Sequence, residues 1–270
     1  MLSKEGVRSR TGDSWFLPIQ QTFAILDADM RKLRHDPSEV LTRMVQPLIW
    51  LLIFGQAIAR AVGGPTGGLS YLNYLAPGIL AQSVLFIAIF YGIALIWERD
   101  LGVVHKIIVS PAPRLALVTG RGLAAGIRSL SQVLIIYILA LFLGIDLRLD
   151  VEGLLGVLAM VVLSGALFAT FSLIIACIVK KRERFMGIGQ VLTMPLFFAS
   201  NALYPIDRMP PWLQVASRIN PMTYQVDAIR SLMIHNEMSQ FGLGVDFGVG
   251  LFLLVVLLLI AARMYPKILY

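Results

Sequence analysis

Six runs of mainly apolar residues recur along the chain and alternate with short polar segments. Their approximate bounds are 41–61, 73–97, 122–143, 154–179, 185–203 and 247–263. A helix needs about 20 mainly apolar residues to cross a bilayer, and the runs are close to that length. The pattern predicts an all-α integral membrane protein with six transmembrane helices in one domain, residues 37–270.

The N-terminal residues 1–36 have a different pattern. A polar tail comes first, and apolar side chains at helical spacing then follow between charged ones. The apolar positions are Phe23, Leu26, Met30 and Leu33. One apolar stripe on a charged helix is typical of a helix that lies in the membrane interface. We expect an N-terminal amphipathic interfacial helix that ends before Pro37.

The polar segment between the second and third runs, residues 97–121, also has a helical period. Charged residues open it, apolar residues recur every three or four positions, and two prolines close it at Pro111 and Pro113. This predicts a short amphipathic helix beneath the membrane. Its candidate functional residues are Glu98, Arg99, Asp100, Leu101, Gly102, Val104, His105 and Ile108. The two interpretations are a docking site for a motor protein and an ordinary interfacial helix over lipid headgroups.

The long segment 204–246 contains two helix-start signals. Asn220 is a good N-cap and Pro221 a good first helical residue, and Pro211 with Trp212 opens a shorter helix in the same way. The segment therefore predicts a helix pair between the fifth and sixth spans, either external or re-entrant.

The composition agrees with a membrane protein: 57% of the residues are hydrophobic and 14% charged, against about 25% charged in soluble domains. With six spans and both termini inside, seventeen of the 23 lysines and arginines fall on the cytoplasmic side and five outside. This follows the positive-inside rule and predicts a multi-pass protein with cytoplasmic termini. We take the membrane to be a bacterial inner membrane. The basic residues flank apolar runs, so the net charge of +7 does not indicate a nucleic-acid partner.

The chain has no motif for chemistry of its own. It contains no Walker A sequence, its three histidines lie in separate segments, and its one cysteine, Cys177, lies in an apolar run. We therefore expect no catalytic residue and no metal site. The predicted spans hold no Asp or Glu, and apart from Arg43, Arg60 and Arg263 near span ends, Arg128 is their only charge. This disfavours proton or sodium coupling, so the energy would come from another polypeptide.

Polar and aromatic residues in the first, second and fifth spans are candidates for a transport path. They are Gln46, Gln82, Phe86, Gln190, Thr193 and Phe197. The alternative is that they bond or pack between helices, as such side chains commonly do in membrane bundles.

Two motifs together resemble one family. The sequence Asn-Pro-Met-Thr-Tyr-Gln-Val-Asp-Ala-Ile-Arg over 220–230, preceded by Met-Pro-Pro-Trp-Leu over 209–213, is similar to the ABC-2 permeases of ATP-binding-cassette exporters, especially the daunorubicin-resistance type. The segment 98–121 resembles the first cytoplasmic loop of that family. The resemblance covers nearly the whole chain.

The resemblance implies partners and roles. The permease would pair with a second copy or a close paralogue and with two ATP-binding subunits, which bind ATP and Mg. Residues 99–109 would form a coupling helix, and the N-terminal helix would be a connecting helix. The gate and folding residues would be Pro211, Trp212, Asn220, Pro221, Tyr224, Asp227 and Arg230.

Three functions follow from the pattern and the resemblance. We expect export of a small amphipathic compound such as a drug, antibiotic or lipid-like molecule. The alternatives are export of a polysaccharide or lipid-linked glycan, and a membrane scaffold that moves nothing.

Overall fold

The computed structural model describes residues 45–58, 71–102, 113–179 and 181–265. Within these residues every named element is a helix. In chain order they are η1 (Ile49–Gly55), α4 (Tyr71–Asp100), α6 (Arg114–Phe142), α7 (Val151–Ile178), α8 (Arg182–Phe198), η2 (Ile206–Arg208), α9 (Pro211–Ile219), α10 (Pro221–Met233) and α11 (Leu243–Met264). The prediction of an all-helical membrane protein is confirmed. The expected interfacial helix with Phe23, Leu26, Met30 and Leu33 lies outside the described residues.

Four of the described helices, α4, α6, α7 and α11, are long and apolar enough to cross a membrane. They correspond to the second, third, fourth and sixth predicted spans. The two others are shorter: the apolar helix Val45–Ile58 and α8, which has 17 residues. A count of six spans therefore stays a prediction. At 1.5 Å per residue, the 30 residues of α4 exceed the roughly 30 Å hydrocarbon core, so its ends extend beyond it.

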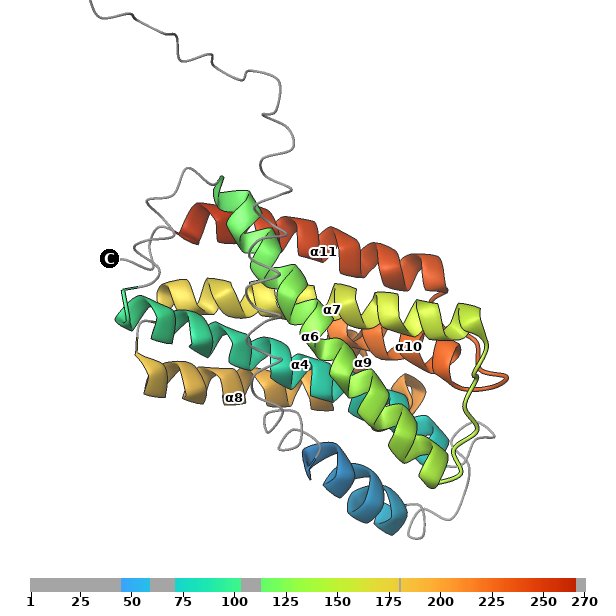
Figure 1. Ribbon diagram of the computed structural model, residues 1–270. Coiled ribbons are helices and arrows are strands. Elements are labelled where there is room, and N and C mark those ends of the chain that lie inside the picture. Colours follow the sequence, from blue (N-terminus) through green and yellow to red (C-terminus); the bar gives the residue numbers. More distant parts are fainter. Residues whose placement is uncertain (1–44, 59–70, 103–112, 180, 266–270) are drawn as a thin grey trace, which may run out of the picture.

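α7 is the centre of the bundle. It packs against α4, α6, α10 and α11, and Figure 1 shows α6 crossing diagonally in front of α4, α7 and α11, with α8 alongside α4. The middle of α7 is rich in small residues, and Ser164, Gly165, Ala166 and Ala169 are all buried. Small side chains let neighbouring backbones approach closely, which is a main source of helix packing in membranes.

The α6–α7 crossing depends on two glycines. A Cβ built on Gly165 would lie 2.8 Å from the Cα atom of Gly126, and one built on Gly126 would overlap the carbonyl oxygen of Val162. Ser129 beside them donates back to the Ala125 carbonyl oxygen at 2.9 Å, so its hydroxyl is satisfied without a partner helix. The two helices thus meet backbone to backbone.

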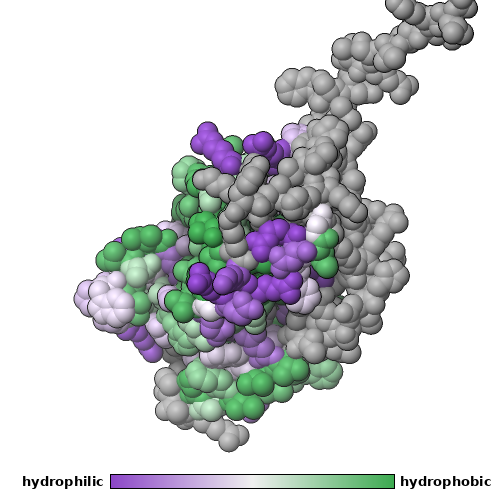
Figure 2. Space-filling view, turned by 90° about the vertical axis from the view of Figure 1, so that its left-hand side faces the viewer, coloured by the Kyte–Doolittle hydropathy of each residue, from purple (hydrophilic) through white to green (hydrophobic). Residues whose placement is uncertain are grey.

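The bundle has two distinct ends. We call the basic end the one formed by the last turns of α4 and α11 and the first turn of α8; it carries Arg99, Lys181, Arg182, Arg184 and Arg263. It lies on the left in Figure 1. Figure 2 looks onto it and shows hydrophilic side chains near its centre with hydrophobic ones around them. The opposite end, which we call the far end, holds the loops 143–150 and 234–242.

The helix pair predicted between the last two spans is present. The Asn220 side chain caps α10 by accepting from the Met222 amide at 3.0 Å, and its amide nitrogen donates to the Leu196 carbonyl oxygen at 2.7 Å. α9 begins at Pro211, as the sequence predicts. One face of α10, formed by Met222, Val226, Ile229 and Met233 at helical spacing, is buried. The re-entrant placement of this pair stays a prediction.

Candidate functional site

The loop between α4 and α6 begins from a helical stem. Glu98, Arg99 and Asp100 form the last turn of α4, which ends at Asp100. In the turn that follows, Gly102 has a φ of 73°, a conformation that favours glycine. Val104, His105 and Ile108 of the expected amphipathic helix lie outside the described residues.

A buried ion pair closes the base of this loop. The Arg121 guanidinium donates to a Glu98 carboxylate oxygen at 2.6 Å, with side chains only 7% and 18% exposed. The pair joins α4 to α6, because α6 begins at Arg114 and not at residue 122 as predicted. The third membrane helix therefore carries Arg114 and Arg121 in addition to Arg128, both before the predicted span 122–143. Pro113 directly before an apolar run is a helix-start signal that could have placed Arg121 correctly.

A second, more exposed contact joins the stem to α8. The Arg182 guanidinium donates to Asp100 at 2.8 Å, and Asp100 also accepts from Arg99 at 2.8 Å. Arg182 lies over the Trp97 ring, 5.2 Å from its centroid. Exposed ion pairs contribute about 0–1 kcal/mol each, so this contact adds less to stability than the buried pair. We call Glu98, Asp100, Arg121 and Arg182 the stem pairs.

Two large apolar side chains beside the stem pairs are exposed on the surface. Leu101 is 76% exposed and Trp97 is 54% exposed. An apolar side chain within a charged rim is a common arrangement at protein interfaces. Glu98, in contrast, faces Arg121 inside the bundle, so it positions the loop and does not form its outer surface.

At the far end, Arg230 links three segments. Its guanidinium lies over the Tyr74 ring, 3.8 Å from the centroid, and donates to the Asn201 carbonyl oxygen at 2.8 Å. The Tyr74 hydroxyl donates to the same carbonyl oxygen at 2.8 Å. Arg230 of the predicted gate motif therefore connects α10 to α4 and to the turn after α8. Tyr74 was not among the predicted site residues.

The other predicted gate residues divide into two groups. Asn220 and Asp227 are buried, whereas Trp212 is 71% exposed on α9. The Tyr224 hydroxyl donates to the Arg218 carbonyl oxygen at 2.7 Å. This contact is structural, because the Tyr224 hydroxyl is satisfied by the chain itself.

A family model described as "ABC-2 type transporter" matches residues 20–234. The chain belongs to the ABC-2 type transporter family. The matched residues include the stem pairs and the gate motif and end before α11.

Curated relatives of this ABC-2 permease have related names. The chain is similar to a protein of Cyanophora paradoxa named as transport permease ycf38, with 29% identity over 94% of this chain and 90% of the relative. It is also similar to the daunorubicin resistance ABC transporter permease protein DrrB1 of Streptomyces coeruleorubidus, with 25% identity over 92% of this chain and 86% of the relative. Nodulation protein J of Rhizobium leguminosarum bv. trifolii is 28% identical over 73% of this chain and 74% of the relative.

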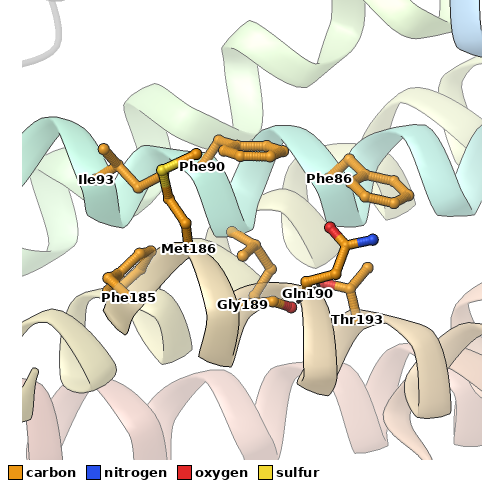
Figure 3. A pocket seen from close by; sticks show the side chains of 9 residues that line it. Phe86, Phe90, Ile93, Phe185, Met186, Gly189, Gln190 and Thr193 are labelled. Carbon is orange, nitrogen blue, oxygen red and sulfur yellow. Dashed lines mark hydrogen bonds between the residues drawn. The ribbon is translucent and has the colours of Figure 1, made fainter. Parts of the chain in front are cut away.

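Three of the six predicted path residues of the permease meet in one cleft between α4 and α8. Phe86 projects from α4, and Gln190 and Thr193 project from α8, with Phe90 and Met186 beside them. Figure 3 shows the side chains of the two helices pointing toward one another. The free space is about 10 Å³, roughly room for one water molecule. A single copy of the permease thus holds this cleft closed.

The three other path residues lie apart from the cleft. Phe197 is buried and packs edge-on against Trp50, with ring centroids 5.6 Å apart. Gln82 is buried within α4. Gln46 is half-buried in the short helix Val45–Ile58.

The outward faces of α11 and α8 differ in chemistry. The exposed side chains in the middle of α11 are all hydrocarbon: Leu251, Phe252, Val255, Val256, Leu259 and Ile260. The exposed face of α8 carries the Gln190 amide among Met186, Val191 and Met194. An amide facing lipid would lose its hydrogen bonds with water. The α8 face of the permease is therefore suited to a polar path or a second protein surface, and the α11 face to lipid.

Proposed function

We propose that this permease is the transmembrane subunit of an ATP-driven exporter whose ATPase is a separate ATP-binding cassette subunit. Two copies of that subunit would bind ATP and Mg at the basic end, which we place in the cytoplasm of a bacterial cell with both chain termini. The chain itself would supply no catalytic residue, and the inner membrane would be its location.

The stem pairs carry this proposal. A loop that transmits the movement of an ATPase must be attached rigidly to the membrane helices that it moves. Glu98 with Arg121 and Asp100 with Arg182 tie the start of the loop to α6 and α8 as well as to α4. Trp97 and Leu101 offer the exposed apolar surface to which a partner can bind. The proposed coupling helix, residues 99–109, includes the stem residues 99–102, and its residues 103–109 lie outside the described residues.

We further propose that two permease copies face each other across α8 and the helix Val45–Ile58. The Gln190 amide and the aromatic side chains of the α4–α8 cleft would then line the path between the copies. A dimer would give Gln190 a polar environment that lipid does not provide. The cleft between α4 and α8 has room for only about 10 Å³, which is too small for a cargo molecule. We therefore propose that α8 moves away from α4 when the path opens.

The proposed cargo is a small amphipathic compound. The cleft lining combines phenylalanine and methionine side chains with one exposed amide, and apolar walls with a few polar groups are typical of sites for such compounds. The similarity to a daunorubicin resistance permease supports the same class. Export of a glycan and a scaffold without transport are the alternatives that the following experiment separates.

The test is transport by reconstituted inside-out vesicles that contain the permease and an ATP-binding cassette subunit co-expressed with it. We expect ATP-dependent accumulation of daunorubicin, used as a fluorescent amphipathic probe, and no accumulation with an ATPase-deficient subunit. A lipid-linked oligosaccharide is the comparison probe. Movement of that probe alone would favour glycan export, and movement of neither probe with no stimulated ATP hydrolysis would favour the scaffold.

A further inference from the structure

A buried pair of carboxyl groups lies at the far end, where α10 and α11 meet. Asp227 on α10 is 2% exposed and Asp246 in the first turn of α11 is fully buried. Ser239 of the loop 234–242 lies between them. Its Oγ atom is 2.9 Å from Asp227 Oδ2 and 2.7 Å from Asp246 Oδ2. The sequence-based bounds placed Asp246 outside the last membrane helix, whereas α11 begins at Leu243 and includes it.

The Ser239 hydroxyl does not have enough hydrogen atoms to donate to both carboxyl groups. A serine hydroxyl has one proton to donate and two lone pairs to accept. One lone pair accepts the Gly242 amide at 2.7 Å. The single hydroxyl proton can reach only one of the two carboxyl oxygens. If both carboxyl groups were ionised, the other contact would place an oxygen lone pair against a negative oxygen within hydrogen-bond distance.

One additional proton resolves this conflict. Asp227 Oδ2 also accepts the Phe241 amide at 3.1 Å, which suits a carboxylate. Asp246 Oδ1 is buried and has no hydrogen-bond partner among the described residues, which suits a neutral carboxyl group. A protonated Asp246 would donate to Ser239, and Ser239 would donate to ionised Asp227. Every donor and acceptor of the serine is then used once.

No basic side chain among the described residues is bonded to either carboxyl. Arg230, the nearest on α10, is engaged with Asn201 and the Tyr74 ring. The other titratable or charged side chains of the elements packed against α10 and α11 are the following: Tyr71, Tyr74, Tyr91, Glu98, Arg99 and Asp100 on α4, Arg114, Arg121, Arg128 and Tyr137 on α6, Glu152 and Cys177 on α7, Arg218 on α9, Tyr224 on α10, His235 and Glu237 on the loop, and Arg263 on α11. The carboxyl pair therefore depends on a proton, not on an ion pair, to remain buried.

We propose that Asp227, Ser239 and Asp246 form a proton-binding site that locks the loop 234–242 onto the junction of α10 and α11. Loss of the proton would leave both aspartates negatively charged beside the single Ser239 hydroxyl, and their repulsion would release the loop. All the contacts that form this site lie within one chain. Only the placement of the far end outside the cell rests on the proposed function. The proposed lock differs from proton-coupled transport, because the proton holds a loop and does not cross the membrane.

The sign of the pH dependence follows from linkage. The locked loop binds a proton, and the released loop exposes an aspartate that is ionised above about pH 4. Release therefore becomes easier as the pH rises, by at most about tenfold per pH unit for one proton.

The test is hydrogen–deuterium exchange of the full-length purified permease between about pH 5 and about pH 8. The Phe241 and Gly242 amides report the lock directly, because they donate to Asp227 and Ser239. After correction for intrinsic exchange, we expect wild-type protection of these amides to fall as the pH rises. Asp246→Asn, whose amide can donate to Ser239 as a protonated carboxyl does, should keep them protected at every pH.

Two further variants complete the test. Asp227→Asn removes the second negative charge and should also flatten the pH profile, so it replaces Asp246→Asn if that variant does not fold. Glu237→Gln changes a carboxyl of the same loop outside the trio and should keep the wild-type slope. A flat wild-type profile, or a wild-type slope in both asparagine variants, would overturn the proposal.

Discussion

Arg121→Met is expected to lower the thermal stability of the purified permease strongly and to abolish ATP hydrolysis that depends on the complex. The change removes the guanidinium that donates to the Glu98 carboxylate at 2.6 Å, in a pair whose arginine and glutamate side chains are only 7% and 18% exposed. Removing one member of a buried ion pair typically costs about 3–5 kcal/mol, mostly because the remaining charge stays buried. The same change frees α6 from the base of the loop.

Two further variants separate the effect of losing the Glu98–Arg121 ion pair from the effect of losing a positive charge on α6. Arg114→Met removes an exposed arginine two turns earlier on the same helix and should leave stability close to wild type. The double variant Glu98→Gln with Arg121→Met removes both charges and should recover much of the stability but not the coupled ATP hydrolysis. Equal thermal unfolding of Arg121→Met and Arg114→Met would show that the pair does not brace the stem.

Gly126→Val is expected to prevent the α6–α7 crossing and to reduce the yield of folded, monodisperse protein severely. Its Cβ would overlap the carbonyl oxygen of Val162 and would lie 3.2 Å from the Val162 Cα atom. Overpacking a well-packed core typically costs about 1–3 kcal/mol, and the obstacle here is backbone, which cannot change rotamer. We expect an effect at or above the upper end of that range.

Gly248→Val is the matched control. Gly248 also lies within a membrane helix, α11, but a Cβ there meets no atom within 4 Å. Both changes add the same β-branched side chain to a helix, so any difference reports the crossing alone. Size-exclusion profiles and thermal unfolding in detergent give the comparison. A Gly126→Val protein that behaves like Gly248→Val would mean that α6 and α7 are not packed backbone to backbone.

Local patterns in the sequence predicted local structure well. Asn220 and Pro221 start α10 where the capping pattern placed them, because an N-cap is decided by atoms a few residues apart. The four longest membrane helices were likewise visible as apolar runs. The helix ends were less predictable, since Arg114–Arg121 and Leu243–Asp246 extend two membrane helices beyond the predicted spans.

The contacts of the candidate site could not be predicted in the same way. Glu98 and Arg121 are 23 residues apart, and Arg230 and Tyr74 are 156 residues apart. Neither pair has a periodic or capping signal, and only the packing of α4 against α6 and α10 brings them together. The trio of Asp227, Ser239 and Asp246 was missed for the same reason, although each residue was visible in the sequence.

The surface around Leu101 offers the sharpest test of ATPase docking. Arg99 is a poor choice for substitution, because it is paired with Asp100 and its loss would disturb the stem as well as the surface. Leu101 is 76% exposed, and Leu149 at the far end is 62% exposed. Leu101→Asp and Leu149→Asp therefore make the same change on opposite ends of the bundle.

We would first measure co-purification of the ATP-binding subunit with wild-type permease and with these two variants. Docking at the basic end predicts that wild type and Leu149→Asp retain the subunit and that Leu101→Asp, folded as judged by its thermal unfolding, loses it. Retention of the subunit by Leu101→Asp, or its loss from Leu149→Asp alone, would contradict docking beside the stem pairs.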